Sequence, residues 1–374
     1  MNHIQTSRER IPAIDIARFY AMVLVYYGHI VEQVMYLGSG PAAVQYKFIY
    51  SFHMPLFFFL SGTVVADRKL ALPLGRFLKL ILGARLVPYL LFSILVGVLS
   101  FFIPGWFPLG ALTDAAAYLK GIAKTLTGFP AFCIPLWFMA LLISVEIFHY
   151  LLIKIVTRPL MLACSAAILY CGGYVLNEAY NFVAQGQAFW FINEVPVVYC
   201  FYAAGILIQR FGWLGRDFSK LKTGIGSILC LLLVFLTFDL NQGPFRIIQA
   251  VVIVLSGHGN LFFFPFTAFA GSLFILLAAR TGPAWTWLLY MGKNSLSLFC
   301  LNGLFYHFIN PGAAKWFAGT FDLTHGTVFA YSSAMTLISL ALCVPLVYLL
   351  TTFLPQFMGK PAKKGPIFGP LIRS

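Results

Sequence analysis

Long apolar runs dominate this sequence, and their length limits what the chain can fold into. Hydropathy places these runs near residues 13–36, 48–66, 86–104, 135–156, 159–177, 191–210, 222–240, 258–280, 290–309 and 327–353. A helix of about 20 apolar residues crosses the hydrocarbon core of a bilayer, and only 10% of the 374 residues are charged. A water-soluble globule of this composition would expose large apolar patches. We therefore predict one all-α, polytopic membrane domain over residues 1–374, a bundle of about ten transmembrane helices.

The distribution of Lys and Arg predicts the orientation of these helices. If both termini are cytoplasmic, 20 of the 25 Lys and Arg residues fall on the cytoplasmic side. This bias is typical of cytoplasmic loops, and shifting the count by one span would destroy it. We therefore expect cytoplasmic tails over residues 1–12 and 355–374. The net charge of +14 then reflects topology in a lipid bilayer and does not indicate nucleic acid as a partner.

Two stretches depart from the simple pattern of spans. Residues 246–257 are apolar but short, so they form either a re-entrant segment or part of an eleventh span. Residues 70–84 carry Arg76 and Lys79 among leucines, which is typical of an interfacial amphipathic helix. The seven cysteines lie in apolar segments without a CxxC pair. We therefore expect neither a disulfide framework nor a metal site.

Ionisable side chains inside the first span indicate function most strongly. Such a side chain is costly in a bilayer, and it marks either a functional site or a polar partner. Arg18 and His29 are eleven positions apart, about three helical turns, so they share a face and lie roughly 16 Å apart. Glu32 follows His29 by one turn, where its carboxylate would orient the imidazole. In the structural alternative, Arg18 snorkels to lipid headgroups and His29 makes one interhelical hydrogen bond.

A second histidine comes from the next span. Because the span over 48–66 runs back inward, His53 is expected in the outer half of the bilayer, at a depth similar to that of His29. Pro55, two positions further on, is expected to break this helix. The break would expose backbone groups beside His53.

Five sequence blocks, in the same order, resemble the acyltransferase 3 family of integral membrane acyltransferases. The first span, IDIARFYAMVLVYYGH (Ile14 to His29), is similar to the Asp-x-x-Arg of that family followed by ten residues and His. The other blocks are SFHMPLFFFLSG (Ser51 to Gly62), ARLVPYL (Ala84 to Leu90), PLWFMALL (Pro135 to Leu142) and GKNSLSLFCLN (Gly292 to Asn302). The chain looks most like the branch that includes fucose 4-O-acetylase-like and exopolysaccharide-modifying proteins.

The resemblance implies an activity and a location. Members are ten-helix bundles of the bacterial inner membrane that deliver an acyl group, usually acetyl, from cytoplasmic acyl-CoA to a carbohydrate hydroxyl at the outer face. In the family, the positions that match Arg18 and His29 are associated with activity. Two positions of this chain depart from the family pattern. Leu82 replaces the first arginine of an Arg-x-x-Arg that ends at Arg85, and Asn302 stands where many relatives carry His.

O-acyl transfer requires a base for the acceptor hydroxyl, and His29 is the candidate. Two mechanisms stay open at this point. His29 either deprotonates the hydroxyl in a ternary complex or attacks the thioester and carries the acyl group itself. The phosphates of acyl-CoA, which we expect to be acetyl-CoA, require cations, and these are available at Arg18, Arg76, Lys79 and Arg85. Positive-inside topology alone would also place basic residues at that surface.

The acceptor, a cell-surface or lipid-linked glycan, needs contacts of its own. His53 would orient the acceptor, stabilise an oxyanion or relay a proton; the alternative is that it packs the helix break. Three further residues are candidate acceptor contacts, through ring stacking or hydrogen bonding: Trp137, Glu194 and His258. Glu146 and His149, one turn apart, are expected to be a polar pair that links helices.

A transporter or flippase of a polysaccharide intermediate is the alternative function, because a polar seam through ten helices also serves as a substrate path. No inverted repeat and no pair of broken helices is visible in the sequence, which counts against common transporter designs. We therefore favour the acyltransferase. A third possibility, a catalytically silent relative, is suggested only by Leu82 and Asn302.

Overall fold

The computed structural model describes residues 11–180, 182, 188–243 and 249–372. Most of the predicted tail over residues 1–12, and residues 246–248 of the unassigned apolar stretch, lie outside the described residues. The described part of the chain is helical and has no β-strand. Its single isolated bridge joins Val252 to Gly257.

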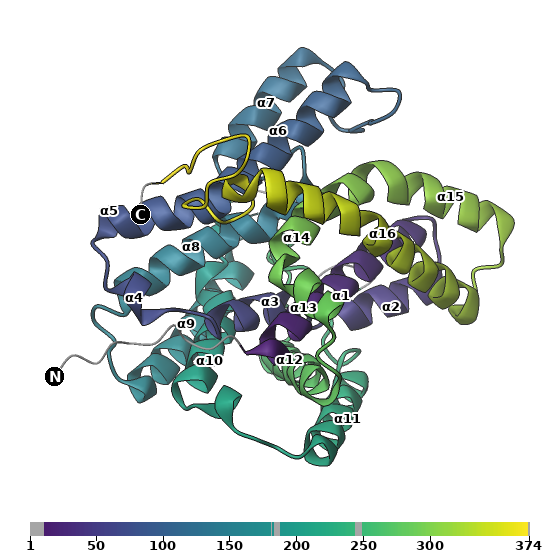
Figure 1. Ribbon diagram of the computed structural model, residues 1–374. Helices are drawn as coiled ribbons and strands as arrows, with labels where there is room; N and C mark the ends of the chain where they lie inside the picture. Colours follow the sequence, from purple (N-terminus) through teal and green to yellow (C-terminus); the bar gives the residue numbers. More distant parts are fainter. Residues whose placement is uncertain (1–10, 181, 183–187, 244–248, 373–374) are drawn as a thin grey trace.

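The chain forms sixteen α-helices over the described residues, drawn in Figure 1. They are α1 (Pro12–Tyr36), α2 (Gly40–Tyr50), α3 (His53–Gly62), α4 (Asp67–Leu70), α5 (Leu74–Ile81), α6 (Val87–Phe102), α7 (Ala115–Leu126), α8 (Trp137–Leu152), α9 (Pro159–Ala179), α10 (Val195–Arg210), α11 (Lys220–Thr237), α12 (Phe263–Thr281), α13 (Thr286–Lys293), α14 (Ser295–Leu304), α15 (Asn310–Thr320) and α16 (His325–Phe353). Short helical turns occur at η2 (Ile134–Leu136), η3 (Phe189–Phe191), η4 (Trp213–Gly215), η5 (Ile253–Leu255) and η7 (Pro355–Phe357). Two π-helical segments are η1 (Leu82–Leu86) and η6 (Phe305–Ile309).

Seven helical segments in the described residues are long and apolar enough to cross a membrane, as expected for an integral membrane protein. They are Pro12–Tyr36, Leu74–Phe102, Ile134–Leu152, Pro159–Ala179, Lys220–Thr237, Phe263–Thr281 and His325–Phe353. The three other predicted spans, near residues 48–66, 191–210 and 290–309, coincide with shorter or interrupted helices. These are α3 after its break from α2, the 16-residue α10, and α14 with η6.

The first helix, α1, lies in the middle of the fold (Figure 1). Pro12 stands in its first turn, where the missing N–H costs no intrahelical hydrogen bond. Helices α2, α3, α12, α13, α14, α15 and α16 all pack against it. Polar side chains on α1 therefore meet other helices, and most of this helix does not face lipid.

The break in the second predicted span precedes Pro55. Helix α2 ends at Tyr50 and α3 begins at His53, so the chain turns at Ser51 and Phe52. Pro55 lies in the first turn of α3, which tolerates proline. The expectation that Pro55 itself breaks the helix is wrong in position, although the break does fall beside His53.

Two glycines bring α3 and α10 into backbone contact. A Cβ atom on Gly62 would collide with the carbonyl oxygen of Tyr202, and one on Gly205 would collide with that of Phe59. Small residues at such crossings let membrane helices approach closely. This contact fixes α3, and with it the helix start that carries His53.

The predicted interfacial helix over residues 70–84 is not a separate element. Helix α5 continues through η1 into α6, giving one segment from Leu74 to Phe102. On α5, Phe77 and Ile81 are buried while Arg76 and Lys79 are exposed, so this part is amphipathic as predicted.

Candidate active site

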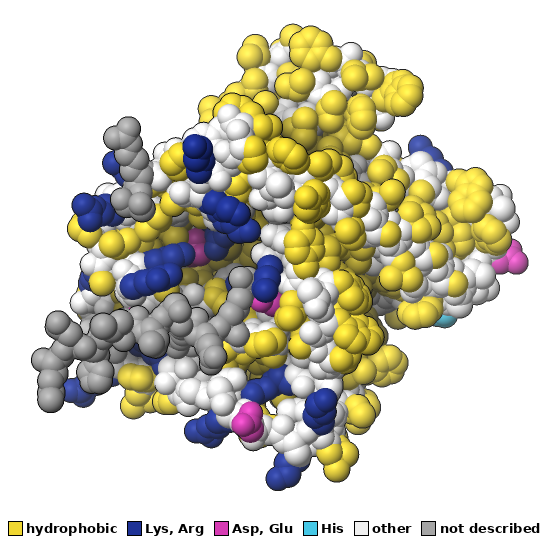
Figure 2. Space-filling view, in the orientation of Figure 1, with side chains coloured by type: hydrophobic (Ala, Val, Ile, Leu, Met, Phe, Trp, Pro, Cys, Tyr) yellow, Lys and Arg dark blue, Asp and Glu magenta, His cyan; other side chains and the backbone are white. Residues whose placement is uncertain are grey.

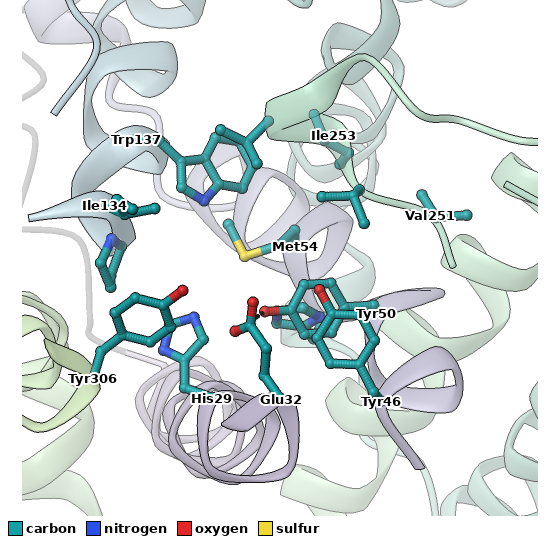
Figure 3. Close-up of a pocket in the computed structure, with 14 residues that line it drawn as sticks. His29, Glu32, Tyr46, Tyr50, Met54, Ile134, Trp137, Val251, Ile253 and Tyr306 are labelled. Atoms are coloured by element: carbon teal, nitrogen blue, oxygen red, sulfur yellow. Dashed lines mark hydrogen bonds between the residues drawn. The ribbon is translucent and has the colours of Figure 1, made fainter. Parts of the chain in front are cut away.

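A small cavity lies beside the C-terminal half of α1. Its volume is about 60 Å³, and segments from α1, α2, α3, η2, α8, η6 and the loop before α12 surround it. Its lining residues are His29, Glu32, Tyr46, Tyr50, His53, Met54, Ile134, Pro135, Trp137, Val251, Val252, Ile253, Val254 and Tyr306. Figure 3 shows His29 and Glu32 pointing from the same helix into this cavity, with Met54 and Trp137 across from them.

The imidazole of His29 is held on one side and open on the other. Its Nδ1 donates a hydrogen bond to Oδ1 of Asn302 over 2.5 Å. The ring of Tyr306 meets it edge-on, with 4.8 Å between the ring centroids. Within the described residues Nε2 makes no hydrogen bond, so this nitrogen is left for a molecule in the cavity.

His53 is held in a similar way by the backbone. Its Nδ1 lies 3.0 Å from the carbonyl oxygen of Ile49, an atom that only accepts hydrogen bonds. The proton therefore sits on Nδ1, and Nε2 of the neutral ring carries a lone pair. His53 is buried at 1% exposure and packs edge-on against Tyr50, 4.5 Å between centroids. The structure thus brings His29 and His53 to the same cavity.

Glu32 lines the cavity but does not orient His29. One carboxylate oxygen accepts a hydrogen bond from the hydroxyl of Tyr36 over 2.7 Å, and the other accepts one from Tyr50 over 3.3 Å. Figure 3 shows the carboxylate turned toward Tyr50, whose ring stacks on Tyr46 at 3.7 Å. The expected orienting role of Glu32 is wrong, because Nδ1 of His29 donates its hydrogen bond to Oδ1 of Asn302 and not to Glu32.

Trp137 forms the opposite wall of the cavity. It begins α8, is 8% exposed and packs against Phe191 with 6.2 Å between ring centroids. Its flat indole face belongs to the same cavity as both histidines.

Glu194 and His258 contact each other and do not line the cavity. Nε2 of His258 lies 2.7 Å from a carboxylate oxygen of Glu194, and both side chains are essentially fully buried. The other carboxylate oxygen of Glu194 accepts hydrogen bonds from Ser256 and Asn193, each over 2.7 Å. This network anchors the loop whose residues Val251–Val254 form one wall of the cavity.

The four predicted CoA-binding cations lie away from the cavity. Arg76 and Lys79 are exposed on α5. Arg18 is half-buried on α1, three turns before His29. Nη2 of Arg85 donates to a carboxylate oxygen of Glu146 over 3.2 Å.

Lys and Arg side chains also gather around a hollow in the surface, which we call the basic hollow. Figure 2 shows Lys and Arg side chains gathered around it, between α5 and α8 on one side and α13 on the other. Helix α13 packs against α1 where Gly292 meets Asp15, one turn before Arg18. Lys69 lies close enough to Arg85 and Glu146 for their charges to act on it, although the sequence had not marked it.

Glu146 and His149 each link helices, but not as a pair. Glu146 joins α8 to η1 through Arg85, and Nδ1 of His149 is hydrogen-bonded to the hydroxyl of Tyr199 on α10 over 2.8 Å. Among the described residues, no group of three His, Cys, Asp or Glu side chains is arranged to hold a metal ion.

The sequence had missed five residues of the cavity and its support. Tyr46, Tyr50 and Tyr306 line it, Asn302 holds His29, and Nε2 of His307 accepts a hydrogen bond from the backbone N–H of Ile134 over 3.2 Å. The available signal was the run of polar groups over residues 302–307, in which Asn302, Tyr306 and His307 follow each other within an otherwise apolar segment.

Comparisons with known proteins identify the family of the chain. Neither the curated proteins nor the solved structures contain a match to the chain. A family model described as an acyltransferase domain, Acyl_transf_3, matches residues 11–348, which include every lining residue of the cavity. The chain therefore belongs to the acyltransferase 3 family.

Proposed function

We propose that this protein is a membrane O-acyltransferase that moves an acetyl group from cytoplasmic acetyl-CoA to a hydroxyl of a cell-surface or lipid-linked glycan. We place it in the bacterial inner membrane, with both termini cytoplasmic, and in the branch of fucose 4-O-acetylase-like and exopolysaccharide-modifying proteins. The observation that carries the proposal is the pair of histidines in one cavity, with Nε2 of His29 open to that cavity.

The reaction follows from that nitrogen. In direct transfer, the acceptor oxygen attacks the thioester carbonyl carbon while Nε2 of His29 takes the hydroxyl proton. The new C–O bond forms, the C–S bond breaks, and the imidazolium returns its proton to the departing thiolate of CoA. His53 acts beside the carbonyl, where it stabilises the developing oxyanion or relays the proton. The volume of about 60 Å³ has room for a few water molecules, which suits the reacting atoms of an acetyl group.

Nε2 also suits the alternative two-step mechanism. In that case it attacks the thioester, CoA leaves, and the acyl-imidazole then passes its acyl group to the glycan. We favour direct transfer, because a single pantetheine arm is long enough to reach from the inner surface to His29. Incubation with labelled acetyl-CoA and no acceptor distinguishes the two mechanisms, since only the two-step route leaves label on the protein.

The donor is held at the basic hollow. We assign the phosphates to Arg18 at the start of α1 and to Arg76, Lys79 and Arg85 on α5 and η1, because such cations bind phosphates with charge-assisted hydrogen bonds. Arg18 and His29 share one face of α1, roughly 16 Å apart. The thioester would therefore approach the cavity along this helix.

The glycan acceptor binds in the cavity itself, on the side away from the entering donor. Trp137, Tyr46 and Tyr50 offer ring faces to a sugar, and Glu32 offers a carboxylate to its hydroxyls. Glu194 and His258 support this contact indirectly, because they fix the loop that carries Val251–Val254.

The test is an acyl-transfer assay with the purified full-length protein in lipid nanodiscs. Radiolabelled acetyl-CoA is supplied with an envelope glycan fraction, and label in the glycan is counted. We expect transfer by the wild type, a loss of at least about 100-fold in His29→Gln, and no change in His325→Gln, which replaces an exposed histidine at the start of α16. Glycan movement across a proteoliposome membrane without acetyl-CoA would instead favour the flippase.

A further inference from the structure

Asn302 is buried deep in the fold, next to the open histidine. Its side chain is fully buried on α14, and its Oδ1 lies 2.5 Å from Nδ1 of His29. Its Nδ2 has no hydrogen-bond partner within the described residues. An amide that leaves one polar group unsatisfied in an apolar interior is costly. The hydrogen bond to His29 therefore explains why a polar residue occupies this buried position.

The backbone after Asn302 aims several side chains at the same region. Helix α14 passes into the π-helical segment η6, and inserted π-turns are frequent at functional sites. This insertion places Tyr306 against the ring of His29 and His307 against the N–H of Ile134. One stretch of six residues thus fixes the imidazole and the cavity wall beside it.

We propose that Asn302 is the positioning residue of the reaction: it holds the proton of neutral His29 on Nδ1 and keeps the lone pair of Nε2 directed at the cavity. This role rests on the proposed function, in which Nε2 takes the proton of the acceptor hydroxyl. The Oδ1 atom also stabilises the imidazolium that forms, because its hydrogen bond becomes charge-assisted at that moment. A histidine held in the wrong tautomer would present N–H to the hydroxyl and accept nothing.

Two substitutions of similar size separate this role from packing. Asn302→Asp keeps an oxygen that only accepts, so the tautomer stays and we expect kcat within about threefold of the wild type. Asn302→Leu removes the acceptor, and we expect kcat to fall at least about 100-fold. The KM for acetyl-CoA should change less than twofold in both variants, because Asn302 contacts His29, about three helical turns from Arg18. Asn310→Leu is the matched control, since Asn310 is a buried amide on α15 without a hydrogen bond to His29.

A spectroscopic readout tests the inference independently of activity. Nitrogen NMR of the full chain labelled with ¹⁵N-histidine, with His29→Gln to assign the signal, reports which ring nitrogen carries the proton. We expect protonated Nδ1 and unprotonated Nε2 in the wild type and in Asn302→Asp, and a mixture of tautomers in Asn302→Leu. A wild-type signal with the proton on Nε2 would overturn the proposal, because Asn302 would then donate to Nδ1.

The outcomes distinguish the two proposals. If the wild type transfers acetyl and Asn302→Leu does so equally well, the role of Asn302 is refuted and the acyltransferase stands. If the wild type has the expected tautomer but transfers no acyl group to any glycan, the proposed function fails while the hydrogen bond is upheld. Asn302→Leu could fail to elute as a single species in size-exclusion chromatography. In that case Asn302→Asp decides: if it elutes as a single species and is inactive, the positioning role is contradicted.

Discussion

The two histidines of the cavity are held by different kinds of acceptor. His53 donates to a backbone carbonyl, so its tautomer does not depend on any other side chain. His29 donates to the side chain of Asn302 and therefore depends on one replaceable group. Both arrangements leave Nε2 of a neutral imidazole as the basic atom. Substitution of a neighbouring side chain can therefore change the tautomer of His29, whereas the tautomer of His53 is held by the backbone.

Sequence reasoning found most of the charged and titratable residues of the cavity, but missed His307 and the neutral partner Asn302. Arg18, His29, Glu32 and His53 were noticeable because each is costly in an apolar segment. Tyr306 gave no such signal, since 17% of the residues are aromatic and most need no special explanation. Which neighbour orients an imidazole depends on contacts between distant helices, and spacing along one helix does not reveal them.

Substitution of Glu32 tests whether this cavity carboxylate binds the acceptor or takes part in proton transfer with His29. Because it binds Tyr36 and Tyr50 and not His29, we expect Glu32→Gln to act mainly on the acceptor. The KM for the glycan should rise about tenfold, the worth of one charge-assisted hydrogen bond, and kcat should stay within about threefold. Steady-state transfer kinetics provide both numbers. A loss of kcat as large as that of His29→Gln would show that Glu32 takes part in the proton transfer.

At the scale of the elements, the positions of most apolar helices were predictable and their interruptions were not. Helices α1, α8, α9, α11, α12 and α16 fall within a few residues of predicted spans. The breaks at Ser51–Phe52 and at Asn294, and the amphipathic helix α7, have no strong local signal. Of these, only the break at Ser51–Phe52 lies beside a cavity residue, His53.

The crossing of α3 and α10 is an element contact that one added carbon atom would disturb. Gly62→Ala would push a methyl group into the carbonyl of Tyr202, and overpacking of this kind costs about 3 kcal/mol or more. We expect a clear drop in the melting temperature of the purified protein, together with loss of transfer as His53 shifts. Gly172→Ala on α9 is the control, because no other part of the protein lies within 4 Å of the position that its methyl group would take. Equal melting temperatures for the two variants would contradict the close contact.

At the scale of the whole molecule, the reactive cavity and the basic hollow are joined by one central helix. Figure 1 shows α1 in the middle of the fold, and Figure 2 shows Lys and Arg side chains gathered on the face seen in the same orientation. The charge bias of the sequence predicts this face, but not that Arg85 is paired with Glu146. The family assignment covers the same region, residues 11–348. The proposed reaction therefore requires that the donor bind near the start of α1 and that the chemistry take place beside His29, three turns further along.

Substitution of Arg85 tests the proposed binding of acetyl-CoA. We expect Arg85→Gln to raise the KM for acetyl-CoA about tenfold while kcat changes little, because a guanidinium–phosphate contact contributes to binding and not to proton transfer. The substitution also leaves Glu146 without its partner, so the double variant Arg85→Gln/Glu146→Gln separates the two effects. Arg158→Gln, at the exposed start of α9, serves as the control. A double variant that regains the wild-type KM would assign Arg85 to structure alone.

The most direct test is a structure of the protein with a non-hydrolysable thioether analogue of acetyl-CoA. The account predicts that the phosphates lie in the basic hollow and that the carbonyl carbon of the analogue reaches the cavity, within about 3.5 Å of the position an acceptor oxygen would occupy beside Nε2 of His29. An analogue whose carbonyl ends outside the cavity, with Nε2 of His29 sealed by protein, would contradict it.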